Sequence, residues 1–242
     1  TTKVAIITGA SRGIGAGVAQ EMLRRGMRVA TCARGVAAIA DGDHSWSQTV
    51  DVGDAPALFA FADRVVERFG RVDLFINNAG QLDPVGPLRD APLDSIRRLI
   101  DVNVMGVIHG SQWFVRHVRG RGGPGVLINI SSGAASSAYA GWAAYCASKA
   151  AVERFSECVA LEEGQGDLRV HAVAPGIVDT GMQQHLRTRS ADQFPMVEKF
   201  REFKAREAFN SPDFVARQLL ALAFDDDRRV RDVVIRLPAE KR

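Results

Sequence analysis

The sequence contains few of the residues that build disulfide-rich or metal-binding proteins. Its 242 residues include three cysteines, Cys32, Cys146 and Cys158, and none lies close to another in the chain. This usage argues against a disulfide framework and a cysteine-based zinc site, and is typical of reduced thiols in a cytosolic protein. The five histidines are dispersed, and no cluster of cysteines or carboxylates accompanies them. We therefore expect no metal cofactor and a cytoplasmic location.

Long hydrophobic runs and blocks of one charge are also missing. No apolar run approaches the roughly 18 residues of a membrane-spanning helix, and the chain starts on a strand-like segment rather than a signal peptide. Lysine and arginine together number 31 against 28 acidic residues, and the basic residues are scattered without aromatic interleaving. This pattern is typical of solvated faces. We expect neither a membrane nor a nucleic acid as a partner.

What the sequence does have is a regular alternation of short apolar runs and longer helical patterns. Hydrophobic residues make up 46% of the chain, which is enough for a sizeable core. The alternation predicts a single α/β domain over residues 1–242, a Rossmann-type doubly wound parallel β-sheet of about seven strands with helices on both faces. The expected strands are Val4–Thr8, Val29–Ala33, Gln48–Asp51, Leu74–Asn77, Val126–Ser131, Val170–Ala174 and Val233–Leu237, and the expected helices cover residues 14–25, 55–69, 93–118, 143–163 and 212–224.

Residues 181–210 interrupt this alternation. They contain two short helical patterns, Met182–Arg189 and Gln193–Ala208, which follow the sixth expected strand. Open parallel sheets bind ligands at the carboxyl ends of their strands. A segment inserted there is well placed to act as a lid over a substrate, and simple packing decoration is the alternative interpretation.

A glycine-rich loop, Thr8–Gly15, joins the first expected strand to the first expected helix. Gly9, Gly13 and Gly15 would allow a tight turn, close approach of the backbone to a pyrophosphate, and close packing of helix against strand. The N-terminus of the helix would supply N–H groups and positive dipole to phosphates. The position of this loop between strand and helix makes a dinucleotide the expected cofactor.

The end of the second expected strand favours NADP over NAD. Folds that bind NAD usually carry an acidic residue there, which binds the ribose hydroxyls. Here the strand ends without a carboxylate and is followed by Arg34, with Arg12 as the other nearby cation. A guanidinium can bind a 2′-phosphate through two parallel hydrogen bonds. We predict NADP(H), with a surface position of Arg34 as the alternative.

Tyr145 and Lys149 are candidates for acid–base chemistry. The chain has only two tyrosines, and Lys149 follows this one by four residues, which puts both side chains on one helix face. An ammonium at about 4 Å and an effective dielectric of about 20 would favour the phenolate by roughly 4 kcal/mol, or about 3 pKa units. Such a phenol approaches the range suited to general acid–base catalysis. Taken alone, the pair also fits a helix surface.

Together these motifs resemble the short-chain dehydrogenase/reductase family over essentially the whole chain. The resemblance implies that Tyr145 donates a proton to a carbonyl oxygen, that Ser132 hydrogen-bonds this oxygen, and that Lys149 holds the nicotinamide ribose and lowers the tyrosine pKa. It also implies that Asn103 positions a water linking Lys149 to solvent. The motifs that carry it are Thr8–Gly15, Asp51-Val52, Asn77-Asn78-Ala79-Gly80, Asn103, Ile130-Ser131-Ser132, Tyr145 with Lys149, and Pro175-Gly176 with Thr180.

The glycine loop, the second strand and the resemblance together give the expected cofactor contacts. They are Gly9, Ser11, Arg12, Gly13, Ile14, Gly15, Arg34, Asp51, Val52, Asn78, Ala79, Gly80, Tyr145, Lys149, Pro175, Gly176, Ile177 and Thr180.

A finer resemblance lies in the second half of the chain. Residues 130–135, 141–146 and 174–183, together with Arg187–Phe203, resemble sepiapterin reductases and the related bacterial and fungal benzil reductases. Those enzymes reduce one carbonyl of a 1,2-dicarbonyl with NADPH. The expected substrate contacts are Ser132, Trp142, Tyr145 and Met182, with Phe194, Met196 and Phe200 as further candidates for an apolar pocket wall or for lid packing.

The leading hypothesis is thus an NADPH-dependent carbonyl reductase acting on a small ketone, a 1,2-dicarbonyl of the benzil or sepiapterin type. An NADP-dependent alcohol, polyol or steroid dehydrogenase would use the same catalytic residues and stays an alternative. The third hypothesis is a non-catalytic NADP-binding sensor, because a fold alone does not determine a function. Relatives pair through the two long helices near residues 93–118 and 143–163, which implies a homodimer or homotetramer.

Overall fold

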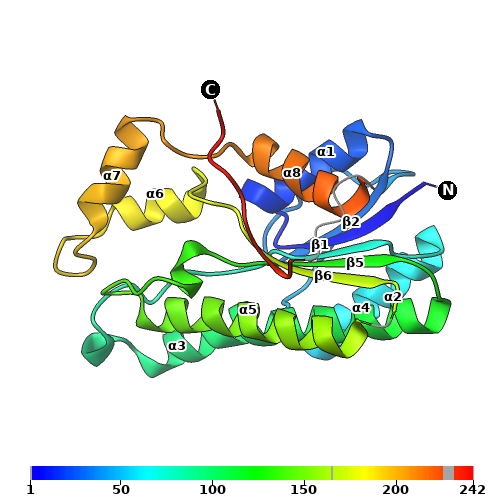
Figure 1. The fold of residues 1–242 in the computed structure, drawn as a ribbon, viewed down its shortest axis with the longest axis horizontal. Helices are drawn as coiled ribbons and strands as arrows, with labels where there is room; N and C mark the ends of the chain where they lie inside the picture. Colours follow the sequence, from blue (N-terminus) through cyan, green and yellow to red (C-terminus); the bar gives the residue numbers. More distant parts are fainter. Residues whose placement is uncertain (1, 165, 226–231, 242) are drawn as a thin grey trace.

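One parallel β-sheet forms the centre of the protein. The computed structural model describes residues 2–164, 166–225 and 232–241. Within these residues, seven parallel strands lie in the order β3-β2-β1-β4-β5-β6-β7 (Figure 1). The chain order reverses between β1 and β4, the point at which doubly wound sheets bind ligands. The strands are β1 (Val4–Thr8), β2 (Arg28–Ala33), β3 (Ser45–Thr49), β4 (Leu74–Asn77), β5 (Gly125–Ile130), β6 (Leu168–Ala174) and β7 (Val234–Arg236).

Helices cover both faces of this sheet, which confirms the predicted doubly wound arrangement. Figure 1 shows α1 and α8 on one face, and α2, α4 and α5 on the other. The helices are α1 (Gly13–Arg24), α2 (Ala55–Phe69), α3 (Leu93–Ile100), α4 (Gly106–Arg121), α5 (Ala143–Glu163), α6 (Gly181–Arg187), α7 (Val197–Ala205) and α8 (Pro212–Phe224), with single turns of 3-10 helix at Leu88–Asp90 and Gly133–Ala135. None of the helices in the described part of the chain has the length and apolar character needed to span a membrane.

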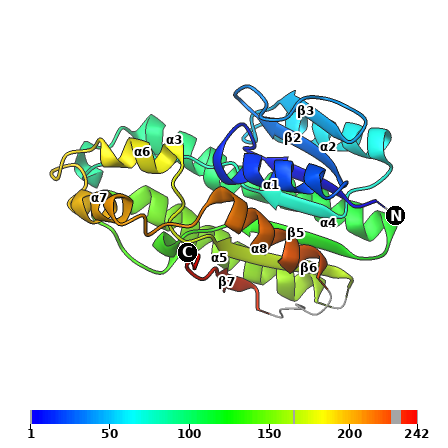
Figure 2. The same ribbon diagram turned by 90° about the horizontal axis from the view of Figure 1, so that it is seen from above.

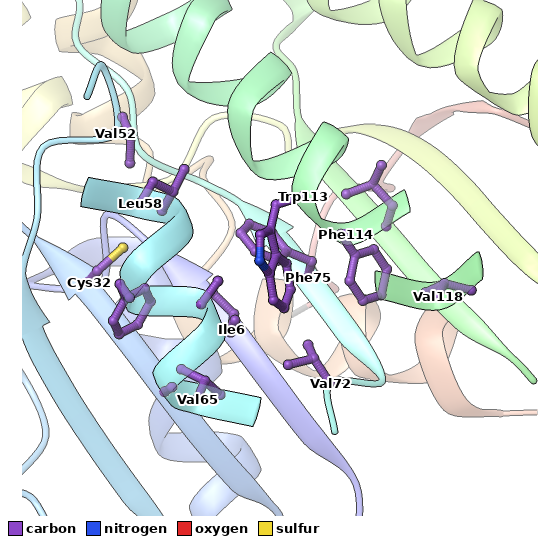
Figure 3. Close-up of a cluster of buried hydrophobic side chains, with 14 of the residues drawn as sticks. Ile6, Cys32, Val52, Leu58, Val65, Val72, Phe75, Trp113, Phe114 and Val118 are labelled. Atoms are coloured by element: carbon purple, nitrogen blue, oxygen red, sulfur yellow. The ribbon is translucent and has the colours of Figure 1, made fainter. Parts of the chain in front are cut away.

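The apolar side chains form one layer on each face of the sheet. Ile6 and Ile7 are neighbours in β1 and enter opposite layers, as the two-residue period of a strand requires. Ile6 packs in the layer of α2 and α4, where Phe75 of β4 meets Trp113 and Phe114 (Figure 3). Each fully buried side chain of this kind contributes about 1.5–3 kcal/mol of transfer free energy. The two layers fix the strand ends, and with them the site described below.

The expected continuous helix over residues 93–118 is wrong. A π-helical turn, Asp101–Met105, separates α3 from α4, and the Gly106 N–H donates to the Asp101 carbonyl across this wider turn. Tertiary contacts hold the turn, because the Asn103 side chain bonds the backbone of Gln81 in both directions, at 2.8 and 2.9 Å. Such turns often occur at functional sites.

Two other elements begin three or more residues away from the expected start. The third strand is Ser45–Thr49 rather than Gln48–Asp51, because it pairs with β2 from Val29 opposite Ser45 onward. Residues 181–210, the lid segment expected from the sequence, are called the lid below. Their second helix begins at Val197 rather than Gln193, since Pro195 disfavours helical backbone in the residue before it. Helices α6 and α7 extend beyond the carboxyl end of the sheet, as Figure 2 shows.

Candidate active site

A cleft of about 400 Å³ opens at the carboxyl end of the sheet. The loops that follow β1, β2, β3, β4, β5 and β6 all contribute to its wall, and the start of α6 closes one side. The cleft therefore lies where the order of the strands reverses. Its residues divide into an open end near β2 and β3, and a buried end near α5.

The glycine loop forms a backbone cradle in this cleft. Gly9 has φ +67°, and a Cβ on it would stand 2.5 Å from the Ala79 Cα. Gly13 opens α1 with φ +61°, and the N-cap residue Arg12 makes no side-chain cap to the first turn. The N–H groups of that turn are therefore available to an anion. This cradle fits the pyrophosphate of a dinucleotide.

The loop after β4 is held against the glycine loop by hydrogen bonds. Thr8 Oγ1 accepts from the N–H groups of Asn78 and Ala79, each at 3.0 Å. Asn78 Nδ2 donates in return to the carbonyls of Thr8 and Gly9 at 2.9 and 3.1 Å. Gly15 serves the same packing, because a Cβ there would lie 2.5 Å from Asn78 Nδ2. Gly15 thus supports the wall and does not line the cleft.

The open end of the cleft carries exposed charges. The Arg34 side chain is 61% exposed, and its Nη1 lies 4.0 Å from an oxygen of Asp51, itself 48% exposed. An exposed ion pair at this distance contributes little to stability. The Arg34 guanidinium can therefore turn toward a ligand without a large cost.

The buried end holds Tyr145 and Lys149, which are 7% and 6% exposed. Lys149 Nζ donates to the Ile130 carbonyl at 2.9 Å and lies 5.8 Å from the centre of the Tyr145 ring. The Ser132 hydroxyl accepts from the Ala134 N–H at 3.2 Å and interacts with the Tyr145 phenol, whose pKa it lowers. The three side chains meet at the point where β5 ends and α5 begins.

Burial dominates the protonation of this end. It raises the pKa of Tyr145 to about 12, an effect that the hydrogen bond from Ser132 opposes, and it lowers the pKa of Lys149 to about 8. The expected lowering of the tyrosine pKa by Lys149 is therefore wrong for this structure. The ammonium is directed at the Ile130 carbonyl, and burial disfavours both its charge and that of the phenolate.

The structure distinguishes the two serines at the end of β5. Ser131 is 2% exposed, and its Oγ donates to Glu153 Oε1 at 2.6 Å. Ser132 is directed toward Tyr145 instead. Only the Ser132 hydroxyl is thus placed beside the phenol.

Asn103 lies behind the cleft rather than on its wall. Its side chain is fully buried, and besides Gln81 it binds the Ser148 hydroxyl at 3.1 Å. A Cβ on Gly80 would meet Asn103 Oδ1 at 3.5 Å and Lys149 Nζ at 3.8 Å, so the three groups are close neighbours. Both ends of the side-chain amide already bind protein partners. A ligand or water can therefore bind this residue only through its backbone, which lies in the π-helical turn.

An apolar cluster lies between the lid and the tyrosine. Trp142, expected at the substrate, is 5% exposed and packs here instead: its ring centre lies 4.6 Å from that of Phe194, 5.6 Å from Phe200 and 5.3 Å from Tyr145. Met182 lines the cleft, as expected. Phe194 and Phe200 belong to the cluster, with Met196 packed against it.

Two groups of polar side-chain contacts attach the lid. Asp179 binds Lys204 at 2.6 Å and Arg187 at 2.8 Å, and these hydrogen bonds, that of Lys204 first, lower the pKa of its carboxyl. Asp83, before α3, binds Arg189 at 2.9 Å and His185 at 2.8 Å. The lid is thereby tied to both sides of the cleft.

Most of the residues expected from the sequence line this one cleft. The exceptions are Gly15 and Asn103, which support its wall, Trp142, and Ile177, which packs toward the lid cluster while Val178 takes the place on the wall. The wall residues not expected from the sequence are Ala33, Gly35, Val50, Val102, Ile130, Ser131, Val178, Gly181 and Gln183. Gln183 directly follows Met182, so its position after the sixth strand was the available signal. Within the described residues there is no group of three or more metal-ligating side chains.

The sequence matches the family described as short chain dehydrogenase over residues 3–191. It is 32% identical over 223 residues to a benzil reductase ((S)-benzoin forming) of Bacillus subtilis, covering 90% of this chain and 91% of that protein. A Bacillus cereus protein of the same description is 29% identical over 226 residues, or 88% of this chain and 91% of that one. Among solved structures, an actinorhodin polyketide ketoreductase with NADPH superposes with a TM-score of 0.85 at 28% identity, over 98% of this chain and 95% of that one.

Proposed function

Because this chain belongs to the short-chain dehydrogenase family, and is therefore an oxidoreductase of a family that uses nicotinamide cofactors, we propose that it is an NADPH-dependent carbonyl reductase. The observation that carries the proposal is the meeting of Tyr145, Ser132 and Lys149 at the buried end of a cleft whose other end is a backbone cradle for phosphates. Reduction of a ketone needs a hydride and a proton at the two ends of one bond. The hydride comes from the reduced nicotinamide, and the protein supplies orientation and the proton.

Tyr145 is the proposed proton donor. With its pKa raised to about 12 the phenol is fully protonated at neutral pH, which is the form that a reduction requires. The Ser132 hydroxyl donates a hydrogen bond to the carbonyl oxygen and so orients it toward the phenol. Lys149 holds the ribose next to the nicotinamide, and its low pKa lets it exchange protons near neutrality. Asn103 supports the proton path from Lys149 to solvent through the π-helical turn.

The preference for NADPH rests on the open end of the cleft. Arg34 lines it and the strand β2 ends without a carboxylate, while Arg12 lines the cleft beside Gly181 at the start of α6. A 2′-phosphate there would gain charge-assisted hydrogen bonds from a guanidinium, each worth about 1.5–3 kcal/mol. NAD lacks the 2′-phosphate and would gain none of these hydrogen bonds, which supports NADPH as the cofactor.

The proposed substrate is a small 1,2-dicarbonyl with aromatic or apolar substituents. The catalytic tyrosine borders a cluster of aromatic rings under the lid, so apolar groups of a substrate would meet apolar surface there. The similarity to two benzil reductases supports the same class. The aspartate that anchors a pterin in sepiapterin reductases has no clear counterpart, since Asp179 is engaged by Arg187 and Lys204.

The test is NADPH oxidation measured with benzil, sepiapterin, simple diketones and ketoacyl thioesters. We expect turnover of benzil and the aromatic diketones, with weaker activity on sepiapterin. Activity on thioesters alone would overturn the substrate class. Equal affinity for NAD and NADP would overturn the cofactor assignment.

A further inference from the structure

Ser131, Glu153 and Arg236 form a chain of polar contacts behind the proposed catalytic residues. Ser131 Oγ donates to Glu153 Oε1 at 2.6 Å. Arg236 donates to the same carboxylate twice, from Nη1 to Oε1 and from Nη2 to Oε2, the latter at 3.0 Å. The contacts pass from a serine that is 2% exposed, through a carboxylate side chain that is 14% exposed, to a half-exposed arginine. They join the end of β5, the middle of α5 and β7.

These contacts are in register with those of the catalytic lysine. Tyr145, Lys149 and Glu153 follow one another at intervals of four on one face of α5. Lys149 binds the carbonyl of Ile130, and one turn later Glu153 binds the hydroxyl of Ser131. Two successive turns of the helix are therefore bonded to two successive residues at the end of the strand. The next residue along the strand is Ser132.

We propose that Glu153 and Ser131 are positioning residues, whose hydrogen bond fixes the register between Ser132 and Tyr145. The inference rests on the proposed function, because it concerns the two hydroxyls that receive the carbonyl oxygen. Ser132 is joined to β5 and Tyr145 to α5, so a slip of the helix along the strand end changes the distance between them. Arg236 holds the carboxylate from the far side and prevents its rotation away from Ser131. A misplacement of about 1 Å in such a site costs about 100-fold in rate.

Four variants separate this role from a simple structural one. Ser131→Ala and Glu153→Ala should each lower kcat about tenfold, less than a full 1 Å displacement would, with KM for the dicarbonyl within about threefold. The double variant should be no slower than Glu153→Ala, because both changes remove one bond. Glu153→Gln should keep kcat within about threefold, since its amide oxygen still accepts from Ser131 and from Nη1 of Arg236 and only the bond from Nη2 of Arg236 is lost.

A spectroscopic and a kinetic readout exclude a loss of folding as the cause. Cofactor with deuterium at the transferred C4 position should give a larger isotope effect on kcat in Ser131→Ala than in the native enzyme, because hydride transfer becomes slower than the other steps. Circular dichroism at the assay temperature should be unchanged. Glu163→Ala is the matched control: it removes an ion pair at the other end of α5, in which Arg119 Nε donates to both carboxylate oxygens at 2.9 and 3.2 Å, and should lower Tm without changing kcat.

The outcomes distinguish this inference from the proposed function. A native enzyme that reduces no dicarbonyl with NADPH contradicts the proposed function. An active native enzyme whose Ser131→Ala variant keeps kcat within twofold, with an unchanged isotope effect, contradicts the positioning role alone. If Glu153→Ala does not fold, Ser131→Ala decides the matter, because it removes a single hydroxyl. A tenfold loss of kcat in Glu163→Ala would likewise contradict the role, since any loosening of α5 would then suffice.

Discussion

The two ends of the cleft differ in how far their ionisable side chains are exposed to solvent. At the open end, Arg34 and Asp51 are charged and solvated, and their ion pair is 4.0 Å long. At the buried end, Tyr145 and Lys149 are almost fully enclosed. Burial raises the pKa of the phenol and lowers that of the ammonium, so it favours the neutral form of both side chains. Exposed charge can select a ligand by sign at little cost in stability, whereas buried groups change their proton affinity and so can do chemistry. Binding specificity and reactivity are therefore separable along one cleft.

The largest effect should come from the buried end. Tyr145→Phe removes the proposed proton donor and should lower kcat about 10³-fold, within the range of general acid catalysis. Affinity for NADPH should stay within about threefold, because the glycine loop and the open end are untouched. Steady-state NADPH oxidation and fluorescence titration of NADPH measure the two quantities. Tyr139→Phe is the matched control, since Tyr139 is the other tyrosine and packs against Trp142. Full activity in Tyr145→Phe would sink the mechanism.

Lys149→Met should affect both functions at once. We expect kcat to fall about 100-fold, as for loss of a group in acid–base catalysis. We also expect a roughly tenfold rise in the Kd for NADPH, as for loss of one charge-assisted hydrogen bond to the ribose. The same two assays measure these changes. A variant that lost turnover but bound NADPH normally would show that the lysine does not hold the ribose.

Arg34→Ala tests the open end. We expect the Kd for NADPH to rise about 10–100-fold, which corresponds to roughly 1.5–3 kcal/mol of charge-assisted bonding, and the Kd for NADH to stay the same. The kcat at saturating NADPH should not change, because the buried end is intact. Arg89→Ala is a suitable control, since its side chain is 80% exposed and pairs with the neighbouring Asp90. A fall in kcat with unchanged Kd would refute the division between the two ends.

The smallest expected effect concerns the pH dependence of the unfolding free energy. It tests whether burial also shifts the pKa of a side chain outside the cleft, that of His117. Burial lowers the pKa of His117, whose Nε2 accepts from the Val72 N–H at 3.1 Å. The unfolded chain therefore takes up a proton at higher pH than the folded chain. The stability contribution is complete above about pH 6.5 and is lost as the pH falls below that value. We expect His117→Gln to lose less unfolding free energy between pH 7.5 and 5.5 than the native protein does, measured by urea denaturation. An equal loss in both proteins would argue against it.

The parts of the site that follow from local sequence were predictable. Near-continuous apolar runs predicted β1, β4 and β5, and a glycine loop between strand and helix predicted the tight turn that opens α1. The spacing of Tyr145 and Lys149 correctly put both on α5. These signals are local because each depends on backbone conformation over a few residues.

What the sequence did not reveal depends on burial and on distant contacts. The spacing of Lys149 from Tyr145 indicated attraction between charges, but burial outweighs it, and burial is a property of the fold. Trp142 has the character of a pocket residue, yet Phe194 of the lid covers it. The π-helical turn at Asn103 arises from contacts with Gln81 and Ser148, and the bond between Ser131 and Glu153 needs β5 and α5 to be packed first.

The residues that form the bonds between Thr8 and Asn78 are synthesised well before those that hold Glu153. The bonds join residues 70 positions apart in the chain, and the contacts of Arg236 with Glu153 join residues 83 positions apart. At about 5–20 residues per second, a ribosome takes roughly 4–14 s to make the first of these spans. The bonds between Thr8 and Asn78 can thus form while the second half of the chain is still being synthesised. The contacts of Arg236 with Glu153 can form only after β7 has been made. The residues of the glycine-loop cradle thus leave the ribosome before those that hold Tyr145 and Ser132 in register.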